Sequence, residues 1–196
     1  MLHSGKLAIF LERFARDAHY VRNILIIRNA HLINRGEYPV LNDAKSDFFF
    51  MNRQRDEDIA STIVELWKTR LPKTYGEQMA AGIQVISPSR RGIAGTESLN
   101  HMLQEALNPP SNRKLEKKFR DTVFREGDRV MQIKNDYDLT WEKDGKEGMG
   151  VFNGDIGVIE TINVPSERMV IRFDERLVEY DFAKLDELDH AWAITV

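Results

Sequence analysis

The sequence predicts an α/β unit followed by a small antiparallel β-barrel. Over roughly the first 110 residues, strand-like and helix-like segments alternate, which is typical of βαβ units around a parallel sheet. After residue 120, short β-branched segments separated by turn residues indicate the barrel. The charge changes at the same place: residues 1–120 hold 19 Lys and Arg against 13 Asp and Glu, and residues 121–196 hold 9 against 18. A basic part followed by an acidic part suggests two units with different partners.

Composition excludes several classes of protein. The 196 residues are 42% hydrophobic and 30% charged, which is ordinary for a folded domain with a sizeable core. The sequence has no cysteine, which excludes disulfides and cysteine metal sites and fits a reducing compartment. No apolar run approaches the roughly 18 residues of a membrane helix, and the start is too charged for a secretory signal. We therefore expect a cytoplasmic protein.

The first part contains two helices and a strand before residue 75. Apolar spacing predicts a helix from residue 24 that stops at Gly36, and residues 47–52 predict a short buried strand. The next helix begins with acidic residues that complement its dipole. Its apolar face consists of Ile59, Ile63, Leu66 and Trp67.

A second strand and helix follow. Residues 83–87 form a continuous apolar strand pattern. Thr96 is the predicted N-cap of a helix whose apolar positions include Leu99 and Leu103. Residues 108–121 contain two prolines and a basic run, which predict a connector to the barrel.

The barrel strands are expected within residues 129–137, 150–162, 168–174 and 177–182. Asn153-Gly154 predicts a hairpin turn, because both residues tolerate positive φ. Residues 190–196 return to an apolar strand pattern at which the sequence stops, so we expect a piece of a longer protein.

The familiar catalytic motifs are absent. The sequence has no GxxxxGK[ST], HExxH or GxSxG motif, and its five histidines lack metal-ligand spacing. We therefore expect neither a complete active site nor a metal site in this chain.

Residues 87–95, SPSRRGIAG, form a loop between a predicted strand and a predicted helix. Arg90 and Arg91 follow the carboxyl end of the strand, where ligands bind in open α/β sheets. Guanidinium groups suit phosphate, and helix amides near Thr96 could hold an anion. A solvated loop with incidental arginines is an equal alternative.

The barrel also carries aromatic residues that could stack on bases, namely Tyr137, Trp141 and Phe152. Chemistry alone favours ordinary packing for them.

Four blocks, in order, resemble RecD-type superfamily 1 DNA helicases, the family of the exodeoxyribonuclease V alpha subunit. The blocks are residues 84–110, 124–138, 151–159 and 178–196. The resemblance covers roughly residues 24–196. It implies a partial RecA-like parallel-sheet domain with an inserted small antiparallel SH3-like β-barrel.

The resemblance also implies boundaries and partners. Residues 1–120 would begin the second RecA-like motor domain, 121–187 would form the SH3-like insertion, and 188–196 would be the returning strand. In such motors two RecA-like domains clamp ATP, and the P-loop and the Mg²⁺-binding acid lie on the first domain, which this sequence lacks. We expect ATP and Mg²⁺ in the complete protein, 5′-to-3′ unwinding in DNA repair, and an isolated chain that is inactive.

The implied partners are single-stranded DNA and the first RecA-like domain. Arg90 and Arg91 are expected near phosphate of ATP or DNA, and Arg129 and Lys134 near the DNA backbone. The DNA-binding candidates are Thr96, Asn100, Gln104, Gln132, Asn135, Asn153 and Gly154. The competing interpretation is a non-enzymatic adaptor or nucleic-acid-binding module built on the SH3-like barrel.

Overall fold

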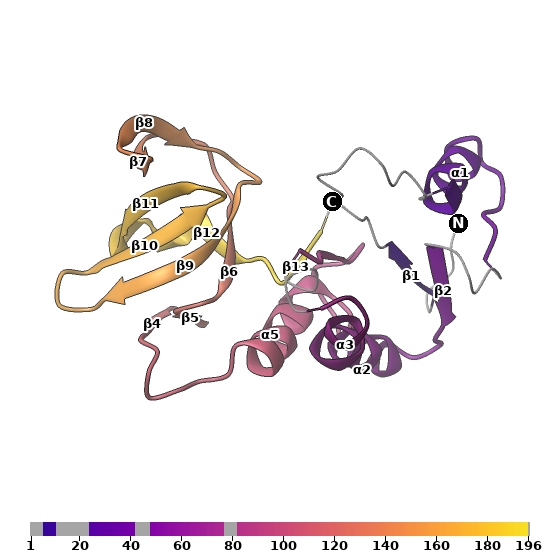
Figure 1. The fold of residues 1–196 in the computed structure, drawn as a ribbon. Coiled ribbons are helices and arrows are strands. Elements are labelled where there is room, and N and C mark those ends of the chain that lie inside the picture. Colours follow the sequence, from indigo (N-terminus) through magenta and orange to yellow (C-terminus); the bar gives the residue numbers. More distant parts are fainter. Residues whose placement is uncertain (1–5, 11–23, 42–47, 77–81, 196) are drawn as a thin grey trace.

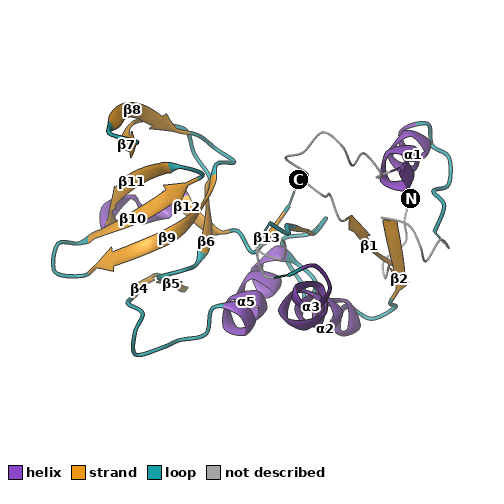
Figure 2. Cartoon of the chain, viewed as in Figure 1, coloured by secondary structure: helices purple, strands orange, loops and turns teal. Residues whose placement is uncertain are grey.

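A computed structural model describes residues 6–10, 24–41, 48–76 and 82–195. Figure 1 shows three parts in a row: a strand pair with one helix near the N-terminus, a group of helices in the middle, and a β-barrel at the far end. Figure 2 shows that the middle is mainly helical and the barrel almost entirely strand. Among the described residues, no helix has the length and apolar character needed to cross a membrane.

The N-terminal part contains α1 (Ile24–Asn34), β1 (Lys6–Phe10) and β2 (Phe48–Asn52). Gly36 adopts a φ of +76°, so the predicted stop after the first helix is confirmed. Phe48 is buried, as expected of the strand over residues 47–52. That strand pairs antiparallel with β1, however, and it has no place in a parallel sheet.

The middle part begins with one continuous run of helix. It consists of α2 (Asp56–Glu65), the π-helical turn η1 (Leu66–Arg70) and α3 (Leu71–Tyr75). Ile63 and Trp67 are buried on the predicted apolar face. They pack with α5 (Thr96–Leu107), whose Leu99 and Leu103 are fully buried. Gly95 is the N-cap of α5, and Thr96 is its first residue, so the predicted cap was wrong by one position.

A two-stranded parallel sheet lies beside these helices. β3 (Val85–Ile86) pairs with β13 (Ala193–Ile194), so residues more than 100 apart in sequence become neighbours. The strand predicted over residues 83–87 is thus limited to Val85–Ile86 in the structure. Ile86 is 61% exposed, although it belongs to a continuous apolar strand pattern. Among the described residues, parallel pairing is limited to these two strands, so the structure does not show the RecA-like parallel sheet that the resemblance implies.

The barrel is a seven-stranded antiparallel sheet in the order β12-β6-β9-β10-β11-β7-β8. Its strands are β6 (Arg129–Gln132), β7 (Asp136–Lys143), β8 (Lys146–Val151), β9 (Ile156–Asn163), β10 (Arg168–Phe173), β11 (Arg176–Asp181) and β12 (Leu188–His190). Alternating inward residues such as Val130, Ile159 and Ile171 form its core. The predicted antiparallel unit is thus confirmed, although β12 and β13 divide the predicted returning strand between two sheets.

Two connections differ from the sequence prediction. The predicted connector over residues 108–121 ends in β4 (Glu116–Phe119), which forms a hairpin with β5 (Thr122–Arg125). The Asn153-Gly154 turn joins β8 to β9, which do not pair with each other, so the predicted hairpin was wrong. Only Gly154 has a positive φ there, at +95°. β8 instead forms a hairpin with β7 through Asp144-Gly145, which sequence reasoning missed.

A buried carboxylate joins α5 to the barrel. Asp128 is fully buried just before β6, and its Oδ2 accepts hydrogen bonds from Gln104 Nε2 at 2.6 Å and from the Arg125 amide at 2.7 Å. Its Oδ1 accepts one from Asn108 Nδ2 at 2.7 Å, and His190 Nε2 lies 3.2 Å from Oδ2. These five residues are the Asp128 cluster. The buried carboxylate of Asp128 thus receives hydrogen-bonding partners from α5 and its C-cap, from β5 and from β12.

The 3₁₀-helix η2 (Phe182–Glu187) is fastened to β7 by an ion pair between Lys184 and Asp136. Burial by itself would raise the pKa of Asp136, but Lys184 and the amides of Asp138 and Leu139 outweigh it, and the pKa is lowered.

The Asp128→Ala variant tests the cluster. It would remove one of the two acceptors of the side-chain amide groups of Gln104 and Asn108 and the acceptor of the Arg125 backbone N–H, so we expect the free energy of unfolding to fall by about 3 kcal/mol. Urea unfolding followed by circular dichroism measures the change. Asp121→Ala, at an exposed turn position, is the matched control and should change stability by less than about 0.5 kcal/mol. Equal effects of the two variants would contradict the role of the cluster.

The Asp136→Asn variant tests the ion pair through pH. The folded-state pKa of Asp136 lies below its unfolded value of about 3.9, so its stabilisation is complete above that value and disappears as the pH falls through the folded-state pKa. We expect the variant to lose about 1–2 kcal/mol at pH 7 and to differ little from the parent chain in strong acid. Unfolding at a series of pH values measures this, with Asp138→Asn as the exposed control. A difference that is constant with pH would contradict the assignment.

Candidate functional site

The loop after β3 is folded tightly enough that only glycine fits at its end. A Cβ on Gly95 would lie 2.5 Å from the Arg91 carbonyl oxygen and 2.6 Å from that of Arg90. The hydroxyl of buried Ser87 donates to the Ala94 carbonyl at 2.8 Å and closes the loop from within. We call residues 87–95 the arginine loop. Its two arginines are therefore carried on a defined backbone.

Both arginine side chains of this loop face solvent. Arg90 Nη2 lies 3.7 Å from Asp189 Oδ2, and the two side chains are 66% and 49% exposed, so this pair contributes little stability. Among the described residues, the ion pair of this loop belongs to Arg90, and Arg91 has no acidic partner within salt-bridge distance. The loop thus presents two guanidinium groups with hydrogen-bonding capacity for an anion.

The amides at the start of α5 are already occupied. The Thr96 amide donates to the Ser89 carbonyl at 2.9 Å, and the Glu97 amide donates to the Arg90 carbonyl at 3.1 Å. The backbone amides of these two residues are therefore not free to hold an anion, contrary to the expectation from the sequence. Thr96 itself is 6% exposed.

Two further DNA-binding candidates on α5 have structural partners. Asn100 Nδ2 donates to the carbonyls of His190 at 3.0 Å and Ala193 at 2.9 Å, and its Oδ1 accepts from the Ala193 amide at 2.7 Å. Gln104 is buried in the Asp128 cluster and also donates to the Val123 carbonyl. Asn108 is the C-cap of α5 and follows Gln104 by four residues, and this spacing is the signal that could have predicted a shared partner.

Gln132 lies inside the barrel. It is fully buried, its Oε1 accepts from the Tyr180 hydroxyl at 3.0 Å, and its Nε2 donates to Glu187 at 3.0 Å. Burial raises the pKa of Tyr180, so this hydroxyl remains protonated and donates. The carboxamide of Gln132 is thus used within the protein.

The remaining candidates, Asn135, Asn153 and Gly154, lie together on the surface. The backbone N–H of Asn153 donates to Asn135 Oδ1 at 2.9 Å, and the backbone N–H of Gly154 donates to the Gln132 carbonyl at 2.8 Å. Beside this turn, the rings of Tyr137 and Phe152 lie 5.7 Å apart.

Trp141 behaves differently from these two aromatics. It packs over Gly148, where a Cβ would lie 2.2 Å from the indole ring, and it contacts the barrel core. The prediction that these aromatic residues serve ordinary packing therefore fits Trp141, whereas the rings of Tyr137 and Phe152 are exposed.

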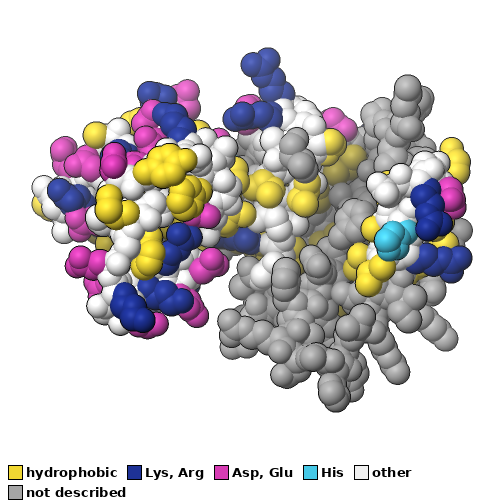
Figure 3. All heavy atoms as spheres, turned by 90° about the horizontal axis from the view of Figure 1, so that it is seen from above, with side chains coloured by type: hydrophobic (Ala, Val, Ile, Leu, Met, Phe, Trp, Pro, Cys, Tyr) yellow, Lys and Arg dark blue, Asp and Glu magenta, His cyan; other side chains and the backbone are white. Residues whose placement is uncertain are grey.

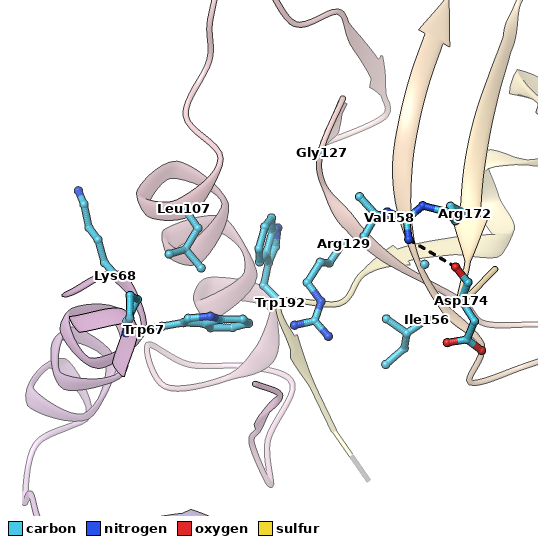
Figure 4. Close-up of a pocket in the computed structure, with 12 residues that line it drawn as sticks. Trp67, Lys68, Leu107, Gly127, Arg129, Ile156, Val158, Arg172, Asp174 and Trp192 are labelled. Atoms are coloured by element: carbon cyan, nitrogen blue, oxygen red, sulfur yellow. Dashed lines mark hydrogen bonds between the residues drawn. The ribbon is translucent and has the colours of Figure 1, made fainter. Parts of the chain in front are cut away.

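A groove of about 600 Å³ separates the middle helices from the barrel. Figure 4 shows Trp67, Leu107 and Trp192 on one side, Ile156 and Val158 on the other, and Arg129 between them. The two indole rings meet edge to face at 5.8 Å.

Arg129 connects the barrel to the middle part of the chain across this groove. Its guanidinium donates to the Ile83 carbonyl at 2.6 Å and to Gln84 Oε1 at 3.1 Å, and it lies over the Trp67 ring. Burial lowers its pKa. Lys134, the other basic candidate, forms an ion pair with Asp186 at 2.9 Å.

Comparisons with known proteins relate the chain to one group of motor enzymes. Residues 99–173 match the family described as the SH3 domain of ATP-dependent RecD-like DNA helicases. The match begins within α5 and ends with β10.

One curated relative is the ATP-dependent RecD2 DNA helicase of Deinococcus radiodurans, which is 28% identical over 171 residues. The alignment covers 87% of this chain and 20% of the relative, so the chain spans about a fifth of that protein's length. The four sequence blocks, the antiparallel barrel and these two matches agree, and they support a RecD-like helicase fragment in which residues 99–173 are similar to the SH3 domain of such helicases.

Proposed function

We propose that the chain is part of the second motor domain of an ATP-dependent RecD-like DNA helicase. The proposed division is 1–120 and 188–196 for the RecA-like domain and 121–187 for the SH3-like insertion. The observation that carries this proposal is the parallel pairing of β3 with β13, because the barrel lies between these strands in sequence. A parallel pair flanked by α2 and α5 is the arrangement expected at one side of a RecA-like sheet.

The arginine loop supplies the proposed phosphate contact. It follows the carboxyl end of β3, which is the edge where α/β sheets bind ligands. Two exposed guanidinium groups fit the phosphates of ATP or of a DNA strand. A bound ATP would offer the phosphoanhydride bond whose hydrolysis drives such motors.

The chain's residues do not fit Mg²⁺ in the same way. In the parts of the chain that the structure describes, no group of three His, Asp or Glu side chains could hold a metal ion. We propose that the P-loop and the metal-binding acid belong to the first RecA-like domain of the complete protein. The chain alone is then expected to lack ATPase and unwinding activity.

Single-stranded DNA is the proposed partner of this part of the motor. The basic balance of residues 1–120 favours contact with the phosphate backbone, and the relative's name describes a DNA helicase. A 5′-to-3′ direction and a role in DNA repair belong to the same proposal. So does a cytoplasmic location.

Fluorescence anisotropy of the chain with labelled single-stranded DNA at two salt concentrations tests this function. We expect weak binding that falls steeply with salt, because phosphate contacts release counterions. The Arg90→Ala/Arg91→Ala variant should bind about tenfold more weakly and show a smaller salt slope, since two cationic contacts are gone.

Arg113→Ala/Lys118→Ala is the matched control, because it removes two positive charges from exposed positions outside the arginine loop. An equal loss in both variants would mean that only net charge matters. Absence of binding at low salt would favour the adaptor interpretation, in which the barrel binds a protein.

A further inference from the structure

Two aromatic rings stand exposed at one end of the barrel. Tyr137 on β7 is 65% exposed, and Phe152 after β8 is 41% exposed, whereas Phe124, Phe173 and Tyr180 are buried in the barrel core. Figure 3 shows hydrophobic side chains gathered on the barrel among charged groups of both signs. Large apolar groups that are exposed together mark binding surfaces more often than scattered ones do.

The two rings are held at a fixed angle. Their centroids are 5.7 Å apart and their planes meet at 74°. Gly150 has a φ of +98°, and a Cβ there would lie 2.9 Å from Phe152 Cζ, so the phenyl ring lies directly over the Gly150 backbone. A side chain at position 150 would displace it.

The turn that carries Phe152 is held by two hydrogen bonds and an ion pair. The Phe152 amide donates to Asp155 Oδ2 at 3.1 Å, and the Asp155 amide donates back to the Phe152 carbonyl at 2.9 Å. Asp155 is anchored in turn by Arg176. A binding surface prepared in this way loses little conformational entropy when a ligand arrives.

Two carboxamides lie beside the rings. Asn135 Nδ2 is 3.5 Å from the Tyr137 hydroxyl, and the side chains of Asn135 and Asn153 are both exposed. Carboxamides carry one acceptor and two donors, which match the hydrogen-bonding edges of a nucleobase. We call Asn135, Tyr137, Phe152 and Asn153 the aromatic tip.

The local charge disfavours contact with phosphate. Residues 121–196 hold 18 acidic against 9 basic residues. Lys184 and Arg176 are already paired with Asp136 and Asp155, and the exposed Asp138 lies next to Tyr137 in sequence, so few cations remain for an incoming anion. A neutral, flat ligand face suits this surface better than a phosphate does.

We propose that the aromatic tip binds the bases of single-stranded DNA by stacking, with Asn135 and Asn153 hydrogen-bonding to base edges. The phosphates of the same strand then face away from the acidic barrel. This inference rests on the proposed DNA-binding function and adds to it a division of labour: the arginine loop contacts phosphate and the tip contacts bases. Stacking of this kind tolerates any base, as a translocating motor requires.

The test compares a short oligothymidine with an abasic oligomer of equal length, which keeps the phosphates and lacks the bases. Anisotropy titrations of the full chain should show about tenfold tighter binding of the oligothymidine. In Tyr137→Ala/Phe152→Ala this preference should vanish, with affinity for the abasic oligomer unchanged. The Tyr137→Phe variant keeps the ring and should keep the preference.

Leu177→Ala, which removes a 44% exposed apolar side chain on β11, is the matched control and should change neither affinity. Arg90→Ala/Arg91→Ala should weaken the binding of both oligomers by the same factor. A preference for bases that survives in the aromatic variant overturns the inference but leaves the proposed function standing. Equal binding of the two oligomers by the parent chain also overturns the inference, leaves the proposed function standing and favours a protein partner at the tip. Absence of binding to either oligomer overturns both.

Discussion

The buried carboxylate of Asp128 is the interaction on which the arrangement of this protein depends. An ionised group in a dry interior is tolerated only when hydrogen bonds replace its lost hydration. Here the replacements come from α5 through Gln104 and Asn108, and from β5 and β12 through Arg125 and His190. None of these groups can move alone without leaving a buried charge or amide unpaired, so the helix and the barrel must keep their relative positions.

A second set of contacts acts at the same joint. Arg125 is almost fully buried and bonds Glu116 and Glu105; burial would lower its pKa, but these acids outweigh it and raise the pKa. On the other side, Arg129 reaches from β6 to the carbonyl of Ile83 just before β3. Polar contacts at this depth define one geometry, whereas an apolar contact of equal area would permit sliding.

Sequence reasoning found the elements better than it found their partners. Local apolar spacing was sufficient for the helix face containing Ile63 and Trp67, because a helix contacts the core through neighbours three and four residues apart. Asn153-Gly154 correctly marked a turn, but turn chemistry cannot say which strands pair across it. Gln104 and Gln132 had the polarity expected of ligand contacts, yet their partners Asp128 and Tyr180 lie 24 and 48 residues away and cannot be inferred from local pattern. For the arginine loop, position after a strand predicted exposed arginines, while the role of Gly95 emerged only from the backbone path.

The chain enters and leaves the barrel at nearly the same place. It departs from the end of α5 at Asn108 and returns through residues 190–193, which Asn100 of the same helix binds through two carbonyls and an amide. A body attached by a single strand of chain can swivel about that connection, whereas two connections, together with the Asp128 hydrogen bonds and the contact of Arg129 with Ile83, restrain the barrel at several points. Torque applied to the barrel by a bound ligand would therefore reach α5 and the arginine loop at its start, instead of being dissipated in a linker.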